Sequence, residues 1–300
     1  MARTKRTPRA PTVAEFFAAD WYAEQNGDVV SSPKEALGHY LHQGWREGRN
    51  PHPLFDVSWY PTQNPTLTDL GEPLAHYLRE GWRHGLNPHP AFDATWYLSQ
   101  HRDVRDAGIE PLTHYLQSGS REGRWPHPLF DPLWYRAQAG LSLTAEEPLV
   151  HYLAQQWPTQ HIAPCAFVDL DFIAQHEGLE HVTTPLDLLT SPPDTPNLLF
   201  DPNTYRERTR GEYDDWHSPS RDFARRAANG DVWLNTFFST RTARTFNPRL
   251  SLMHEVGLAA RQSYRALGRY ADGSVVVGDE TLGPGPAPDQ PVAIFVHFDA

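Results

Sequence analysis

Aromatic and aliphatic residues recur along the chain as two short stretches with helical spacing. In the first stretch, Phe92 and Trp96 are four residues apart, so both lie on one face of a helix. The second stretch carries one apolar stripe at positions i, i+3, i+4 and i+8, formed by Leu74, Tyr77, Leu78 and Trp82. The pattern therefore predicts pairs of short amphipathic helices.

Polar and special residues mark the ends of these helices. Asp93 stands at the start of the first helix, where its carboxylate caps free amides and meets the helix dipole. Pro73 fits the first turn of the second helix. Gly85 suits a left-handed C-terminal cap, and Asn87-Pro88 prevents continuation of the helix. Each unit is thus expected to be two helices followed by a proline-rich turn.

Three phrases repeat in step. Phe-Asp-x-x-Trp-Tyr begins at Phe55, Phe92 and Phe130, and Phe17 with Trp21-Tyr22 is an earlier relative. His-Tyr-Leu begins at His39, His76, His114 and His151. The phrase Gly-Trp-Arg-Glu-Gly-Arg-Asn-Pro-His-Pro, with variations, occupies 44–53, 81–90 and 119–128. The steps from Phe17 to Phe167 are 38, 37, 38 and 37 residues, which indicates tandem repeats.

The predicted fold class is mainly α, with tandem two-helix repeats of about 37 residues stacked in an array and a short β segment at the C-terminus. Neither helix is stable alone at this length, so stacking has to bury the aromatic faces. Later copies are altered: Phe200-Asp201 keeps part of the first phrase, and 219–230 is expected to be an altered second helix.

The array is followed by a different composition. The run Ser274–Val277 predicts a strand, 283–288 is a Pro/Gly linker, and a plausible helix covers 252–267. The apolar run 291–298 is typical of a buried strand that pairs with Val275–Val277 or belongs to a sheet beyond the sequence. The predicted domains are a disordered basic tail (1–15), the repeat array (16–230), a connecting region (231–290) and the first strand of a further domain (291–300).

Composition narrows the possible functions. The formal net charge of −11 argues against nucleic acid, which usually requires a basic face. No stretch approaches the roughly 18 apolar residues of a membrane span. The basic N-terminus lacks an apolar segment behind it, and Cys165 is the single cysteine, so no intrachain disulfide forms. We expect a cytoplasmic protein without nucleic-acid partners or a transmembrane segment.

The repeated histidines and tryptophans are candidates for chemistry. His39, His76, His114 and His151 precede the buried stripe, and we expect each to hydrogen-bond the neighbouring repeat rather than a metal. His52, His89 and His127 lie between prolines and are interpreted as spacers between repeats. The Trp-Tyr pairs are predicted to be core residues, with a sugar-stacking platform as the alternative. Asp169 and Asp171 have the spacing of a metal-binding pair but fall inside a degenerate repeat.

A strip of charged residues recurs after the second helix. We predict it to be either a solvated face with local ion pairs or a docking ridge for a partner. Its members are Arg46, Glu47, Arg49, Arg121, Glu122 and Arg124.

The repeat phrases resemble those that precede glycosyltransferase domains in bacterial polysaccharide-synthesis proteins. The closing Val292–Asp299 resembles the opening strand of the rhamnan synthesis protein F family. The resemblance implies a parent enzyme that builds a rhamnose-containing cell-surface polysaccharide from a nucleotide-sugar donor, with its catalytic pockets beyond residue 300. His297 and Asp299 match the end of that first strand, where α/β sheets commonly bind ligands.

Two functions are therefore expected of the chain. The first is the N-terminal repeat module of such a glycosyltransferase, not catalytic by itself and without a cofactor of its own. It would dock polysaccharide-assembly proteins or a glycan acceptor, and through a partner lie peripherally on a membrane. The alternative is a free-standing helical-repeat module that binds a protein or a glycan and has no enzymatic activity.

Overall fold

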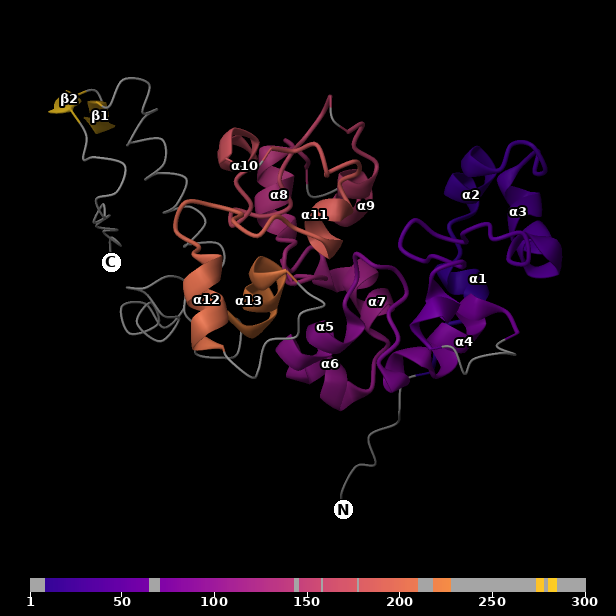
Figure 1. Cartoon of the computed structure of the whole chain (residues 1–300). Helices are drawn as coiled ribbons and strands as arrows, with labels where there is room; N and C mark the ends of the chain where they lie inside the picture. The colour runs from indigo at the N-terminus through magenta and orange to yellow at the C-terminus, as the bar shows by residue number, and fades with distance from the viewer. Residues whose placement is uncertain are drawn as a thin grey trace, which may run out of the picture. The chain divides into compact units, whose positions relative to one another are not determined.

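The computed structural model of the chain describes residues 9–64, 71–142, 146–157, 159–176, 178–209 and 218–227, together with the strands 274–277 and 280–284 (Figure 1). The chain divides into two compact units, Met1–Gln155 and Gln156–Ala300. The sequence predicted one array over 16–230, and each unit is described here by itself. The prediction of a mainly helical protein is confirmed for the described part of 9–227.

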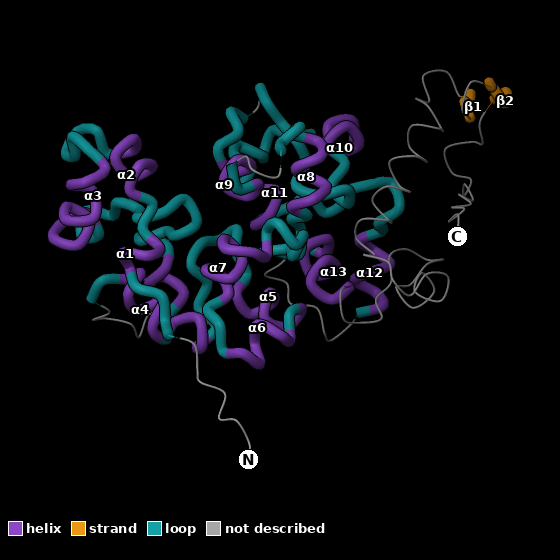
Figure 2. The backbone as a smooth tube through the Cα atoms, turned by 180° about the vertical axis from the view of Figure 1, so that it is seen from behind, coloured by secondary structure: helices purple, strands orange, loops and turns teal. Residues whose placement is uncertain are grey.

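The first unit consists of short helices joined by loops (Figure 2). Its α-helices are α1 (Val13–Phe16), α2 (Ala19–Gln25), α3 (Pro33–His39), α4 (Pro73–Arg79), α5 (Ala94–Gln100), α6 (Arg102–Ala107), α7 (Pro111–His114), α8 (Pro132–Gln138) and α9 (Pro148–Leu153). Two π-helical turns, η1 (Tyr40–Gly44) and η4 (Tyr115–Gly119), and two 3₁₀ turns, η2 (Tyr60–Gln63) and η3 (Gly81–His84), extend or replace helices.

The predicted caps are present where the sequence placed them. The Asp93 carboxylate accepts the amide of Trp96 at 2.9 Å and starts α5. Gly85 ends η3 with φ of 77°, a left-handed conformation that a side chain would strain. Because α4 already ends at Arg79, the predicted stripe is divided, and Trp82 lies in the 3₁₀ turn after it.

A cluster of three fully buried aromatic rings fills each central repeat. In the second repeat, Phe55, Tyr60 and Tyr77 are each 0% exposed, and the two tyrosines meet edge to face at 5.9 Å. The same arrangement occurs in the third and fourth repeats, formed by Phe92, Tyr97 and Tyr115 and by Phe130, Tyr135 and Tyr152. Aromatic burial therefore supplies much of the hydrophobic stabilisation of this unit.

The predicted boundary of the disordered tail, at residue 15, lies too far along the chain. Residues 9–15 are described, and Thr12 and Glu15 form a reciprocal capping box that starts α1. Helix α1 contacts α4 of the second repeat, and the two lie side by side in both views (Figures 1 and 2). The sequence interpretation gave weight to the basic charges of this segment and overlooked the Thr-x-x-Glu capping signal.

The second unit contains α10 (Leu170–His176), α11 (Asp187–Thr190), α12 (Pro202–Arg208) and α13 (Pro219–Ala227). Phe167 stacks on Phe223 at 5.4 Å, and both rings are 0% exposed. Two short strands, β1 (Ser274–Val277) and β2 (Glu280–Pro284), pair antiparallel in this unit. Thus β2 includes the start of the predicted linker, whereas the predicted helix 252–267 and strand 291–298 lie outside the described residues.

Candidate functional site

A fully buried tyrosine is paired with a histidine in every repeat of the first unit. The hydroxyl of Tyr60 lies 2.7 Å from His76 Nδ1, and Tyr97 is 2.8 Å from His114. The equivalent pairs are Tyr22–His39 and Tyr135–His151. The histidines were expected to bond the neighbouring repeat. That prediction is wrong, because the partner tyrosine stands 16 or 17 residues earlier in the same repeat.

Three of the four pairs lie against a glycine, whereas Gln156 stands at the equivalent position after His151. A Cβ built on Gly81 would meet the Tyr60 hydroxyl oxygen at 2.0 Å and His76 Nδ1 at 3.3 Å. Gly44 and Gly119 show the same close approach, at 2.1 and 2.3 Å. The first glycine of the third phrase is thus required because no side chain fits beside the tyrosine hydroxyl.

A second tyrosine connects successive repeats. Tyr77 Oη donates to Glu110 Oε1 at 2.7 Å, and Glu110 also accepts the amides of Leu112 and Thr113 at the start of α7. The sequence interpretation missed this role of glutamate, although a Glu-Pro dipeptide recurs before each inner second helix. The equivalent bonds run from Tyr40 to Glu72 and from Tyr115 to Glu147.

Burial disfavours the charged form of two of these glutamates. Desolvation raises the pKa of Glu110 and of Glu147, although the hydrogen bonds they accept act in the opposite direction. The hydroxyl that donates to Glu110 belongs to Tyr77, whose own pKa is raised well above its ordinary value by burial. Glu110 and the tyrosine hydroxyl thus act as a buried acceptor and donor.

The charged strip separates into two kinds of residue. Arg49 bonds Asp28 through two nitrogens, at 3.0 and 2.9 Å, and Arg124 bonds Asp103 in the same way, at 2.9 and 2.8 Å. Their flanking glutamates join these pairs, with Arg49–Glu47 and Arg124–Glu122 both at 2.6 Å. Arg49 and Arg124 therefore hold segments of their own repeats together.

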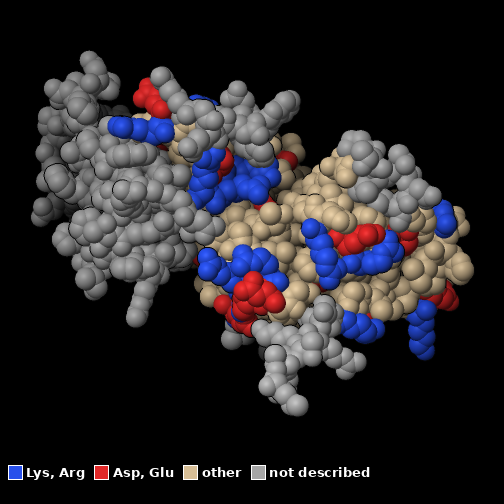
Figure 3. All heavy atoms as spheres, turned by 90° about the horizontal axis from the view of Figure 1, so that it is seen from below, with Lys and Arg blue, Asp and Glu red and all other residues tan. Residues whose placement is uncertain are grey.

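Exposed arginines make up the other kind. Arg46 and Arg121 each donate to the carbonyl four residues earlier, at 2.6 and 3.0 Å, and Arg83 does the same at 2.6 Å in the repeat between them. The guanidinium carbons of Arg46 and Arg83 also lie 4.2 Å above the rings of Trp45 and Trp82. Basic and acidic side chains gather in adjacent patches on one face of the protein (Figure 3).

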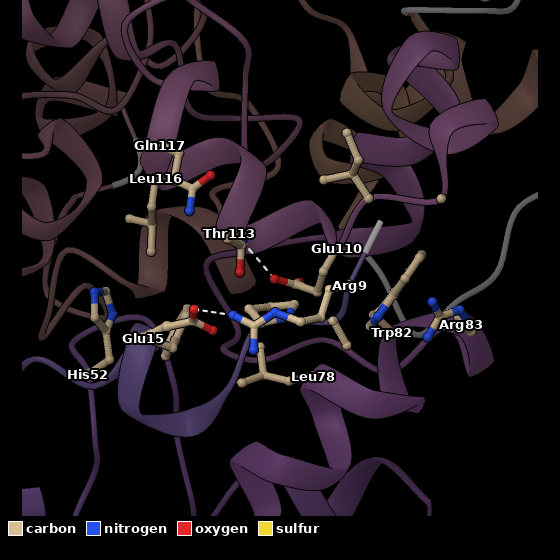
Figure 4. Close-up of a pocket in the computed structure, with 15 residues that line it drawn as sticks. Arg9, Glu15, His52, Leu78, Trp82, Arg83, Glu110, Thr113, Leu116 and Gln117 are labelled. Atoms are coloured by element: carbon tan, nitrogen blue, oxygen red, sulfur yellow. Dashed lines mark hydrogen bonds and ion pairs between the residues drawn. The ribbon is translucent and has the colours of Figure 1, made fainter. Parts of the chain in front are cut away.

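A pocket of about 740 Å³ opens in the first unit (Figure 4). Its sides come from the segment before and within α1, from α4 with η3, and from the segment 108–117. Buried Phe16, Leu78, Trp82 and Glu110 line its interior, and the exposed side chains of Arg9 and Arg83 lie at its margin. The volume falls in the range of about 300–1,000 Å³ that is typical of ligand pockets.

Hydrogen-bond donors in the pocket lack partners, whereas its carboxylates have them. The buried Nε1 of Trp82 has no acceptor within the described part of the chain. Glu110 accepts three hydrogen bonds, and Glu15 pairs with Arg9 and Thr12. The pocket therefore offers a ligand apolar contacts and donors more readily than acceptors.

The predicted ligand-binding residues His297 and Asp299 lie outside the described residues, as would any pocket for a nucleotide-sugar donor beyond them. Asp169 is used as a helix cap, since its carboxylate accepts the amide of Phe172 at 3.2 Å. Within the described residues, no three His, Cys, Asp or Glu side chains gather as metal ligands. No helix there is long and apolar enough to cross a membrane.

The sequence matches no protein-family model, and comparison with curated proteins and with solved structures found no match either.

Proposed function

We propose that the repeats form a stacked, non-catalytic scaffold that serves a cytoplasmic bacterial glycosyltransferase of rhamnan-type polysaccharide synthesis. The observation that carries the scaffold role is the hydrogen bond from the Tyr77 hydroxyl to Glu110, which recurs between successive repeats. The recurring glutamates before the second helices are thus used to hold successive repeats together. The glycosyltransferase connection is supported by the repeat phrases and by the closing strand sequence.

The docking surface of this scaffold is the arginine row, which we define as Arg46, Arg83 and Arg121. These three side chains are exposed and take the same conformation, with a hydrogen bond to the carbonyl four residues earlier. No ion pair joins any of them to a described carboxylate. An acidic surface of a polysaccharide-assembly protein fits this row through charge complementarity.

Charge reversal tests the docking role. We expect the triple variant Arg46→Glu, Arg83→Glu and Arg121→Glu, introduced into the native gene, to lower the rhamnose content of the cell surface at least severalfold. The reason is that three like charges facing an acidic partner oppose association. Arg105→Glu is the matched control, because Arg105 is exposed and its nearest carboxylate is the adjacent Asp106.

The amount of protein in the cell and its circular dichroism spectrum show whether the triple variant still folds. A folded triple variant with unchanged surface rhamnose would refute the docking role of the arginine row. A surface polysaccharide without rhamnose in the wild-type strain would refute the rhamnan assignment.

A further inference from the structure

We propose that the pocket between α1, α4 with η3 and the segment 108–117 binds an extended, proline-containing peptide that carries an acidic residue. The proposal rests on a buried hydrogen-bond donor that has no partner in the described part of the chain and lines a pocket large enough for a ligand. Trp82 is 7% exposed, lines the pocket, and its Nε1 has no acceptor in the described part of the chain. A buried unsatisfied donor costs about 1–3 kcal/mol, so a ligand carbonyl at this place removes that penalty.

A second donor faces the same space. His52 accepts the amide of Leu54 on Nδ1 at 3.0 Å, so its neutral ring carries the proton on Nε2. The ring is neutral at physiological pH, because burial lowers the pKa of His52 to about 3. Its Nε2 therefore donates, and no described residue is bonded to it. The pocket thus offers donors from two of its sides (Figure 4).

The carboxylates of the pocket are already used, whereas the buried Thr113 hydroxyl, which also lines it, has no partner in the described part of the chain and can donate or accept. Glu110 and Glu15 each accept three hydrogen bonds from the protein, out of about four that a carboxylate can accept. A donor group of a ligand therefore finds no free carboxylate here, and the Thr113 hydroxyl can donate to a ligand carbonyl. A proline-containing peptide presents carbonyl oxygens without the corresponding amides, and its extended conformation is formed before binding.

A glycan fits these observations less well. Sugars usually bind on exposed aromatic faces, whereas Trp82 has the Arg83 guanidinium over its ring and Phe16 packs on His52 at 4.7 Å. Phe16 and Trp82 are both 7% exposed. Leu78 and Leu116 add apolar side chains to the lining, against which the aliphatic parts of a peptide can pack.

The arginines at the margin of the pocket are the reason for proposing an acidic residue in the ligand. Arg83 is exposed and has no ion pair with a described carboxylate. The Arg9 side chain is 72% exposed and forms an ion pair with Glu15. A carboxylate on the peptide therefore meets an unneutralised positive charge beside the proline-binding surface.

Arg83 belongs both to the arginine row and to the margin of this pocket, so the site is tested through Trp82, by binding of a defined peptide to the purified full chain. The probe is fluorescein-labelled Pro-Leu-Pro-Pro-Leu-Pro-Glu, with fluorescence anisotropy as the readout. We expect saturable binding by the wild type and about tenfold weaker binding by Trp82→Phe, which removes the Nε1 donor and keeps an aromatic ring; tenfold corresponds to about 1.4 kcal/mol.

Trp45→Phe is the matched control, because Trp45 occupies the equivalent place in the first repeat, with Arg46 4.2 Å above its ring, and lies outside the pocket. We expect it to bind as the wild type does. Leu116→Gln changes a part-exposed residue on the pocket side and should weaken binding without affecting the fold.

Three outcomes overturn the proposal: no saturable binding of the probe, equal binding by Trp82→Phe and wild type, or displacement of the probe by a rhamnose oligosaccharide but not by unlabelled peptide. Loss of surface rhamnose in the arginine-row variant, measured separately, would leave the scaffold function standing in each of these cases.

Discussion

Gly81→Ala gives the sharpest test of how the core of a single repeat is packed. The added Cβ would lie 2.0 Å from the Tyr60 hydroxyl oxygen and 3.2 Å from Tyr60 Cζ. Tyr60 is 0% exposed and bonds His76 at 2.7 Å, so it has no free space in which to move without losing that bond. The clash therefore forces either displacement of a core ring or loss of a buried hydrogen bond.

The expected cost follows from these two effects. Overpacking a core by one methyl group costs about 1–3 kcal/mol, and leaving a buried hydrogen-bonding group unsatisfied costs about 1–3 kcal/mol. We expect Gly81→Ala to lower the free energy of unfolding by about 1–3 kcal/mol if one effect occurs and by about 2–6 kcal/mol if both occur, measured by urea denaturation of the full chain. Gly38→Ala is the control, because Gly38 lies inside α3 with nothing within 4 Å of its Cβ position. There, alanine should stabilise by about 0.5–1 kcal/mol through helix propensity.

The double variant Tyr60→Phe with Gly81→Ala shows whether the clash with the tyrosine hydroxyl causes the loss of stability. Tyr60→Phe removes the oxygen that the new Cβ would meet and by itself costs the bond to His76, about 1–2 kcal/mol. Gly81→Ala should then cost much less in the Tyr60→Phe background than in the wild type, with a coupling of about 1–3 kcal/mol. Additive costs, or a Gly81→Ala variant as stable as the wild type, would show that the tyrosine hydroxyl does not impose glycine at this position.

Other expected outcomes concern the core, the connection between repeats and pH. Trp96→Ala should cost about 3–5 kcal/mol in urea unfolding, because Trp96 is 8% exposed; a cost under about 1 kcal/mol would revive the sugar-platform interpretation. Glu110→Ala should cost about 2–4 kcal/mol, since it leaves Tyr77 Oη and two helix amides without their acceptor. Glu110→Gln keeps the acceptor for Tyr77 Oη and the Leu112 amide but turns its NH2 toward the Thr113 amide, so it should cost less, about 1–2 kcal/mol; equal costs would contradict the bonding scheme. Burial lowers the pKa of His89 to about 4, so its folded form binds fewer protons than the unfolded chain, and its stabilisation is complete above about pH 6.5 and is lost as the pH falls toward 4. His89→Asn should therefore reduce the loss of stability between pH 7 and pH 5, measured by urea midpoints; Asn197 already accepts the equivalent amide, that of Leu199, at 3.0 Å. If His89→Asn loses as much stability between pH 7 and pH 5 as the wild type, His89 is not the cause of the loss.

Local features of the fold could be predicted from the sequence because their causes are local. The Asp93 cap and the left-handed Gly85 depend on residues within one turn of the helix end, and both are confirmed. The burial of Trp96 follows from its helical spacing and is also confirmed. These predictions required no knowledge of how distant segments meet.

Contacts between distant segments could not be predicted in the same way. Periodicity places His76 on an apolar face but does not identify the tyrosine that this face meets. Likewise, Arg124 was assigned to a surface strip because its partner, Asp103, stands 21 residues earlier. The pocket was missed for the same reason, since its residues come from the N-terminal segment and from different repeats.

The last copy of the repeat shows what the tyrosine–histidine pair is for. Tyr205 in α12 is 0% exposed, and its hydroxyl donates to Asp222 at 2.6 Å, with the same separation of 17 residues as Tyr22 and His39. Aspartate can replace histidine here only if the retained property is an acceptor for the tyrosine hydroxyl. Both side chains are also metal ligands, but a tyrosine proton that points at the acceptor atom occupies the lone pair that a metal would need. The histidines of the earlier repeats are therefore explained by their hydrogen bonds. A ligand is expected instead at the pocket, where the Trp82 Nε1 donor has no partner in the described part of the chain.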